Sequence, residues 1–201
     1  MFGSLQFKIA TEEWEFAQIH RLNYTTFVEE IPQHSSNPDQ ALIDKFHHEN
    51  TYVICLDRGQ LAGMIAVRGN RPFSLDAKLD ALESYLPPGR RLCEFRLLAV
   101  DRQHRNGWVF WGMGKLLAEH CLRAGYELAL ISGTTRQQKL YHHLGFRPFG
   151  PLVGEPGAQF QPMYLSLEAF QRRARMFRRA LGRDTIAPEL QDLITSELEE
   201  E

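Results

Sequence analysis

The stretch LYHHLGF at residues 140–146 is the part of the chain that decides the fold. It follows an apolar, strand-like run, LALI at residues 128–131, after a short polar segment. Gly145 stands where a helix should end, because a residue without Cβ readily adopts the left-handed conformation that closes a helix. Phe146 then anchors the next segment in the core. The pattern predicts a strand, a short helix with Tyr141 in its last turns, and a return to the sheet.

The rest of the chain predicts strands and helices in an order that fits a mixed sheet. Residues 7–10 are expected to form a first strand. Thr11 is expected to cap the helix that follows, because acidic residues stand in its first turn. Residues 57–60 read DRGQ, a hairpin turn between two β-rich runs. Further strands are expected at 92–100, 127–132 and 159–167, with helices at 39–49, 110–124 and 136–144 and a loosely helical insert at 74–86.

This order predicts an α+β fold with a mixed, mostly antiparallel central sheet flanked by helices. Antiparallel pairing comes first, and a strand–helix–strand crossover comes later. Residues 1–167 are expected to form one domain and residues 168–201 a charged, helical C-terminal extension.

Composition excludes several classes of protein. The chain has 201 residues, 43% of them hydrophobic and 24% charged, which is typical of a globular domain. A formal net charge of -2 does not favour nucleic acid or a membrane surface as partner. No apolar run is long enough to span a bilayer, and the N-terminus does not resemble a signal peptide. Cys55, Cys93 and Cys121 lie far apart, so we expect reduced thiols, no metal and a cytoplasmic location.

A second pattern lies between the strand at 92–100 and the helix that follows it. The strand ends in Leu98-Ala99-Val100, and RNG at 105–107 and GMGKLL at 112–117 come next. Amide groups at the start of a helix form an anion site, and glycines let a backbone approach a pyrophosphate closely.

Together with the Tyr141 segment, these motifs resemble the GNAT superfamily of acyl-CoA-dependent N-acyltransferases. The resemblance covers about residues 5–167 and implies a GNAT-like fold. It also implies that the donor is bound by Leu98, Ala99, Val100, Arg105, Asn106, Gly107, Gly112, Gly114 and Thr134. The insertion WVFW at 108–111 leaves two alternatives. Either the loop is longer than in the family, or the helix begins earlier and the two later glycines are packing residues. The same aromatic stretch could line an acyl tunnel or belong to the core.

The strand CEFRLLAV at 93–100 is similar to the Glu-containing strand of N-acyl amino acid synthases and, more distantly, of acyl-homoserine-lactone synthases. Residues 21–30 are similar to their first helix. Those enzymes commonly carry an Arg three positions after the Glu, where this chain has Leu97, with Arg96 one position earlier. This resemblance implies a phosphopantetheine thioester as co-substrate, carried by coenzyme A or by acyl carrier protein, which would then be a partner.

Aminolysis of a thioester needs a base for the amine and an acid for the departing thiolate. Glu94 is the candidate base, directly or through water; the alternative is a buried structural carboxylate paired with an Arg. Tyr141 is the candidate acid, and its alternative is helix packing. Arg96 could bind an acceptor carboxylate bidentately or pair with Glu94. Glu29 could line the acceptor side or belong to a solvated helix face.

The sequence therefore predicts an N-acyltransferase that moves an acyl group to a primary amine, with an amino acid among the candidate acceptors, by direct attack in a ternary complex. The alternative is a non-catalytic acyl-thioester-binding module that docks to a partner enzyme through its charged C-terminus. A hydrolase is a weaker interpretation, because no Gly-x-Ser-x-Gly motif is present. The arginines after Leu167 favour either a solvated helix face or a surface for acyl carrier protein or for the phosphates of coenzyme A.

Overall fold

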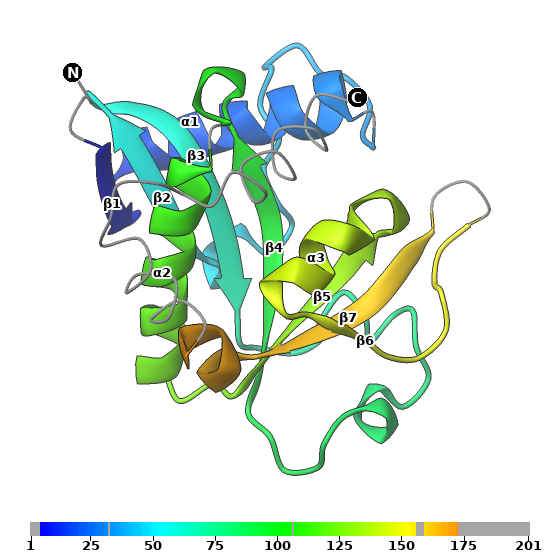
Figure 1. Ribbon diagram of the computed structural model, residues 1–201. Helices are drawn as coiled ribbons and strands as arrows, with labels where there is room; N and C mark the ends of the chain where they lie inside the picture. Colours follow the sequence, from blue (N-terminus) through cyan, green and yellow to red (C-terminus); the bar gives the residue numbers. More distant parts are fainter. Residues whose placement is uncertain (1–4, 32, 106, 156–158, 173–201) are drawn as a thin grey trace. The chain divides into compact units, whose positions relative to one another are not determined.

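The computed structural model describes residues 5–31, 33–105, 107–155 and 159–172 (Figure 1). Contacts divide the chain into two compact units. The first holds the described residues up to Val67 together with Arg96–Leu117, and the second holds Arg68–Phe95 and the described residues from Ala118 onward. Seven strands follow the order β1-β2-β3-β4-β5-β7-β6, and β4 (Leu92–Val100) has residues in both units.

In the first unit, β1 (Leu5–Ile9), β2 (Thr51–Asp57) and β3 (Gln60–Arg68) pair antiparallel. The hairpin between β2 and β3 turns at Arg58 and Gly59, whose φ angles are 50° and 80°. Two successive positive φ values match the right-handed twist of the strands that they join. The turn expected at residues 57–60 is therefore confirmed.

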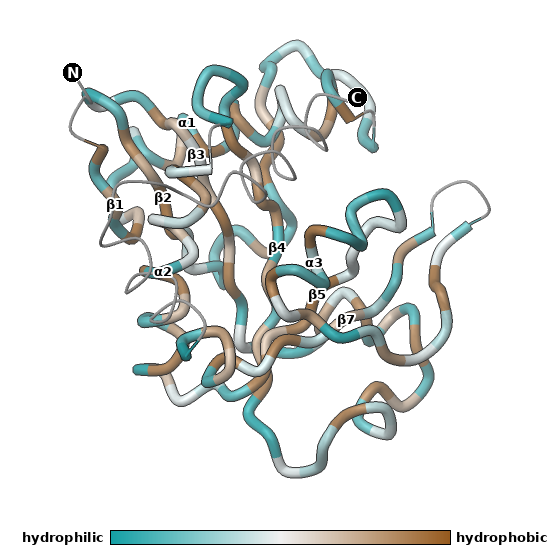
Figure 2. Tube along the Cα trace, in the orientation of Figure 1, coloured by the Kyte–Doolittle hydropathy of each residue, from teal (hydrophilic) through white to brown (hydrophobic). Residues whose placement is uncertain are grey.

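Helices α1 (Glu13–Tyr24) and α2 (Trp108–Arg123) cover opposite faces of these strands. Met64 belongs to the buried cluster that contains Ile19 of α1. Gly63 lies so close to α2 that a Cβ there would stand 2.8 Å from Val109 Cγ1. Since successive side chains of a strand point to opposite faces, the two helices lie on different sides. Figure 2 shows the apolar residues along β2 and β3 that both helices cover.

The cap of α1 differs from the expected one. Glu12, not Thr11, is the capping residue, and it forms a capping box with Glu15. The Thr11 amide instead donates to Glu15 Oε2 at 2.8 Å. A carboxylate three residues into the helix satisfies the free amides at its start better than the Thr11 hydroxyl, which donates to Glu12.

The helix expected at 39–49 is wrong. The segment is mostly irregular, with a turn at residues 45–46, and it ends in one 3₁₀ turn, His47–Glu49. Polar side chains bond its backbone: Asn37 Nδ2 donates to the Ala41 carbonyl at 3.1 Å, and the Phe46 amide donates to Asp44 Oδ1 at 2.9 Å. Such bonds compete with helical hydrogen bonding.

In the second unit, the start of β4 pairs parallel with β5 (Leu128–Thr134), and β5 pairs antiparallel with β7 (Phe160–Ser166). The sequence missed the two-residue strand β6 (Arg147–Pro148), which pairs with β7. Helix α3 (Gln138–Leu144) ends at Gly145, whose φ of 100° confirms the helix end. The mixed sheet flanked by helices is confirmed as well.

The insert at 74–86 forms turns and one 3₁₀ segment, Leu82–Tyr85. Its leucines pack against β5 in a second buried cluster: Phe73, Leu75, Leu79, Leu82, Leu86, Leu130, Phe149 and Val153. Residues 167–172 are helical, and the rest of the expected C-terminal extension lies outside the described residues. Within the described ranges, no helix is long and apolar enough to cross a membrane.

Candidate active site

The parallel ladder between β4 and β5 is short. It joins Leu92 to Leu128, Cys93 to Ala129 and Glu94 to Leu130, while β5 itself runs on to Thr134. Three residues after Glu94, Leu97 adopts a φ of 53° inside β4. A bulky residue in the left-handed region is a backbone outlier of the kind that concentrates at functional sites. The sequence offered no sign of it, since residues in this region are usually Gly or Asn.

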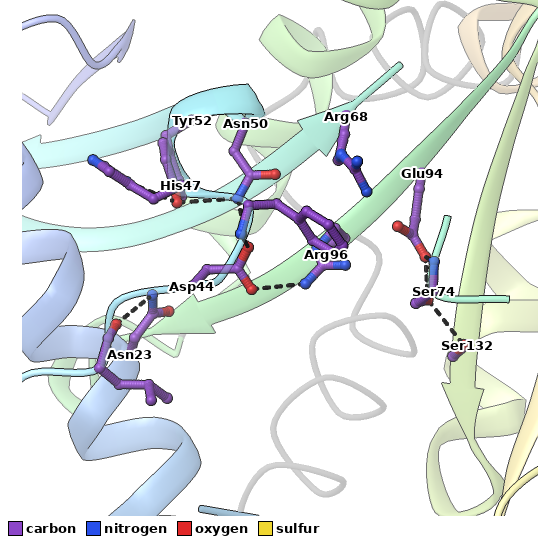
Figure 3. A network of polar contacts seen from close by, with 12 residues as sticks. Asn23, Asp44, His47, Asn50, Tyr52, Arg68, Ser74, Glu94, Arg96 and Ser132 are labelled. Carbon is purple, nitrogen blue, oxygen red and sulfur yellow. Dashed lines mark hydrogen bonds and ion pairs between the residues drawn. The ribbon is translucent and has the colours of Figure 1, made fainter. Parts of the chain in front are cut away.

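The Glu94 side chain lies at the end of this ladder and is 1% exposed. Its Oε1 accepts the Ser74 amide at 2.9 Å and also the Ser74 hydroxyl (Figure 3). Ser74 Oγ is 3.5 Å from Ser132 Oγ on β5, and Lys78 Nζ is 3.5 Å from the same oxygen. The insert at 74–86 therefore orients the candidate base. The sequence did not single out Ser74, Lys78 or Ser132.

Tyr141 lies on α3, over the following residue of β5. A Cβ on Gly133 would stand 2.9 Å from Tyr141 Cε2, so the ring needs a glycine at that position. Because successive residues of a strand face opposite sides of the sheet, Ser132 and Gly133 face opposite sides of β5. Ser74, which binds Glu94, lies on the Ser132 side, and the Tyr141 ring lies on the Gly133 side. Glu94 and Tyr141 thus approach β5 from opposite faces. The Tyr141 hydroxyl donates to Gln137 Oε1 at 2.9 Å.

Arg96, the candidate acceptor residue, pairs with a carboxylate that the sequence did not single out. Its Nη2 is 2.7 Å from Asp44 Oδ2, and the two side chains are only 13% and 9% exposed. The guanidinium lies 4.8 Å from the centre of the Phe46 ring. Asn50 Nδ2 donates to Asp44 Oδ1 at 3.0 Å and to the Tyr52 hydroxyl at 3.1 Å (Figure 3). The ion pair is therefore buried and supported by polar neighbours.

Two histidines extend this network. His47 Nδ1 is 3.2 Å from the Tyr52 hydroxyl and 3.4 Å from His20 Nε2. Burial lowers the pKa of both imidazoles; His48 adds to the effect on His47, and His47 adds to the effect on His20. Asp44 and Glu13 partly oppose the lowering at His47. Burial raises the pKa of Tyr52. The network therefore favours neutral imidazoles and a neutral phenol.

The candidate donor loop leads into α2, which begins at Trp108. The Trp111 amide donates to the Gly107 carbonyl at 3.0 Å, which is a helical i→i−4 bond. Gly112 and Gly114 are therefore interior helix positions, and a Cβ on Gly112 would stand 2.1 Å from Phe7 Cζ. The structure places Gly112 as a packing residue, the second of the two alternatives, and a phosphate contact by either glycine stays a prediction. The start of α2 is the place in this segment where helix amides favour an anion.

The two arginines of this loop share one carboxylate. Arg105 Nε donates to the Val100 carbonyl at 3.0 Å, and Arg105 Nη2 pairs with Glu30. Arg102 Nε is 2.8 Å from the same carboxylate. The neighbouring Glu29, the residue chosen from the sequence, is exposed.

The remaining sequence candidates take varied positions. Leu98 is 37% exposed and Ala99 is buried. Thr134 ends β5 next to a 3₁₀ turn that its side chain does not cap, and Asn106 lies outside the described residues. Val109, within the stretch WVFW at 108–111, is fully buried against Gly63 and therefore belongs to the core.

The three thiols are buried and free, as expected. Burial raises the pKa of Cys55 to about 11 and that of Cys93 well above its ordinary value. Since the thiolate is the nucleophile, neither thiol is suited to covalent catalysis. Among the described residues, no group of three or more His, Cys, Asp or Glu side chains could hold a metal ion.

Residues 18–168 match the family model described as "N-acyl amino acid synthase FeeM". The chain belongs to this family. It is therefore an acyltransferase, and the resemblance stated from the Glu94 strand and the Tyr141 helix is confirmed. A search of curated protein sequences found no match.

Solved structures show the same GNAT-like fold. The CoA-dependent acyl-homoserine lactone synthase BjaI, solved with SAM and isopentyl-CoA, is 18% identical, with a TM-score of 0.68 over 86% of this chain and 90% of that one. FeeM from uncultured soil microbes is 17% identical, with a TM-score of 0.67 over 85% and 95%. A putative N-acetyltransferase from Lactobacillus plantarum is 17% identical, with a TM-score of 0.60 over 81% and 98%.

Proposed function

We propose that this acyltransferase joins the acyl group of a phosphopantetheine thioester to the α-amine of an amino acid. The observation that carries the proposal is the buried Glu94 carboxylate at the end of the β4–β5 ladder, in a chain of the FeeM family. The BjaI structure contains isopentyl-CoA, which supports coenzyme A as one carrier of the donor. Acyl carrier protein is the other carrier that we propose.

Backbone groups of β5 are candidates to bind the pantetheine arm. Peptide groups of β5 beyond Leu130 lie past the last ladder pair with β4, and pantetheine amides can pair with strand groups of this kind. The phosphate would bind beside Arg105 in the loop before α2, because a guanidinium and the start of a helix both favour an anion.

The acceptor would bind at the Asp44–Arg96 ion pair. An amino acid carries one carboxylate and one ammonium group, so it can pair with Arg96 through the first and with Asp44 through the second. Both buried charges would then exchange an internal partner for a ligand partner and stay compensated. This exchange supports an amino acid over a simple amine, because an uncompensated buried charge is strongly destabilising.

The reaction needs three proton transfers around one displacement. Glu94 takes the first proton from the ammonium group, directly or through a water molecule, and the resulting neutral amine attacks the thioester carbon and forms the C–N bond. Backbone amides stabilise the oxyanion. The C–S bond breaks, and Tyr141 protonates the thiolate. The nitrogen loses its second proton to water, and the Tyr141 phenolate regains a proton from water. A phenol and a thiol differ by about 1.5 pKa units, so the transfer from Tyr141 to the thiolate is uphill by only ~2 kcal/mol. The Tyr141 hydroxyl must first turn away from Gln137.

Thiol release from acyl-CoA in the presence of amino acids tests these roles. Glu94→Gln and Tyr141→Phe should each lower turnover by about 100-fold or more, the usual contribution of general acid–base catalysis. The Kd for the acyl donor should stay nearly unchanged in both. Glu127→Gln and Tyr85→Phe are matched controls at surface positions. Normal turnover in both test variants would contradict the proposal.

We also propose a reducing compartment such as the cytoplasm as the location of the enzyme. The three buried free thiols support it, because structural disulfides are rare there.

A further inference from the structure

Glu30 bridges the two arginines of the donor loop. Its Oε1 lies 2.8 Å from Arg102 Nε, and its Oε2 pairs with Arg105 Nη2. The Glu30 side chain is only 7% exposed, whereas Arg102 is 68% and Arg105 16% exposed. A buried carboxylate therefore pairs with two guanidinium groups, each of which carries five N–H donors.

The backbone holds this carboxylate in place. Glu30 ends a π-helical segment, Thr25–Glu30, in which the Ile31 amide donates to the Thr26 carbonyl at 2.9 Å. The wider turn changes the helix face on which the last residues stand, and Glu29 is left exposed while Glu30 reaches the loop.

The loop is fixed from its other side as well. The Asp101 amide donates to the Ala62 carbonyl at 3.0 Å. His104 Nδ1 is 3.0 Å from Asp101 Oδ2, and His104 Nε2 is 3.4 Å from Asp57 Oδ2. Contacts on both sides therefore hold the loop of residues 101–105 in place. They fix the positions of Arg102 and Arg105 relative to the start of α2.

The carboxylate also sets the charge of the proposed phosphate site. Arg102 and Arg105 contribute two positive charges, and Glu30 removes one of them. Phosphopantetheine ends in one phosphate, which carries a charge of about -2 when free and about -1 as the phosphodiester that joins it to acyl carrier protein. Coenzyme A carries a diphosphate and a second phosphomonoester, for about -4 in all. A negative charge at the site disfavours the more highly charged ligand.

We propose that Glu30 is a specificity-determining residue that positions both arginines and favours phosphopantetheine, as carried by acyl carrier protein, over coenzyme A. This inference rests on the donor site proposed above. Both ligands share the phosphate next to the pantetheine arm, so a loss of arginine contact to that phosphate should lower both affinities alike. The ratio of their affinities isolates the charge effect.

Isothermal titration with coenzyme A and with free 4′-phosphopantetheine tests the inference. Glu30→Gln should shift the affinity ratio toward coenzyme A by about fivefold at low salt, and less at high salt. Glu30→Asp keeps the charge and should keep the wild-type ratio, even if both ligands bind more weakly. Glu13→Gln is the control, because it removes an exposed carboxylate of the same unit, and it should leave the ratio unchanged.

An unchanged ratio in folded Glu30→Gln overturns the inference and leaves the donor site intact. If the wild type binds neither ligand, the proposed donor site fails and the inference fails with it. If Glu30→Gln does not fold, Arg102→Gln decides, because that side chain is exposed. It lowers the site charge further, so its ratio should shift toward phosphopantetheine by about threefold or more. An unchanged ratio there also overturns the inference.

Discussion

Asp44→Asn should lower the stability of the protein strongly, because it leaves the Arg96 charge buried without its carboxylate. The pair is 2.7 Å apart, and the two side chains are 9% and 13% exposed. The asparagine amide also has only one acceptor oxygen, whereas Asp44 accepts from Arg96, Asn50 and the Phe46 amide. The amide nitrogen of the introduced asparagine would therefore stand against one of these three donors.

Breaking a buried ion pair by removing one partner costs about 3–5 kcal/mol. A domain of this size has a free energy of unfolding of about 5–15 kcal/mol. Since 1 kcal/mol shifts Tm by about 2–4 °C at this chain length, Tm should fall by roughly 6–20 °C. Urea unfolding and thermal unfolding, followed by circular dichroism, measure both quantities.

Asp39→Asn is the matched control. Its carboxylate is exposed in the same segment, so the substitution should change the free energy of unfolding by less than about 0.5 kcal/mol. Combining Asp44→Asn with Arg96→Met removes the stranded charge and should recover most of the lost stability. A loss below about 1 kcal/mol in Asp44→Asn alone would show that Asp44 does not compensate the Arg96 charge.

Three further predictions concern the core, the histidines and the cysteine thiols. Gly112→Ala should destabilise the protein by about 1–3 kcal/mol despite the better helix propensity of Ala, because the added Cβ meets the Phe7 ring. Phe7→Leu should recover part of this loss. A Gly112→Ala variant that is more stable than the wild type would show that the Phe7 ring does not restrict this position. The free energy of unfolding should fall as pH drops from about 7.5 to 5, since the unfolded chain binds protons that His20 and His47, with lowered pKa, do not bind when folded. His47→Gln should flatten this dependence and the exposed His34→Gln should not; equal slopes in pH-dependent urea titrations would contradict the assignment. With the pKa of Cys55 at about 11 and all three thiols buried, Ellman's reagent at pH 8 should titrate no thiol in the native protein and all three after unfolding, and rapid labelling of native protein would argue against burial.

The elements that the sequence predicted correctly depend on local chemistry. Gly145 ends α3 because of its own backbone freedom, and the hairpin at 57–60 turns through two residues that adopt positive φ. The helix expected at 39–49 failed where side chains of Asn37 and Asp44 bond the backbone, a choice that hydrophobic periodicity does not reveal.

The candidate site could be predicted only in part, since its key contacts join distant residues. Glu94 and Tyr141 were found through motifs, whereas Ser74 lies 20 residues from Glu94 along the chain. Asp44 lies 52 residues from Arg96, and Glu30 lies 75 residues from Arg105. Only the folded chain brings these partners together. The left-handed φ of Leu97 could not be predicted from the sequence, because the surrounding structure imposes it.

The central claim is tested most directly by one measurement of acyl transfer. The purified protein is mixed with an acyl-phosphopantetheine thioester, with and without an amino acid pool, and thiol release and products are followed by mass spectrometry. We predict that one N-acyl amino acid forms for each thiol released, and that thiol release depends on the amino acid. Tight thioester binding without release, or release that is independent of any amine, would contradict it.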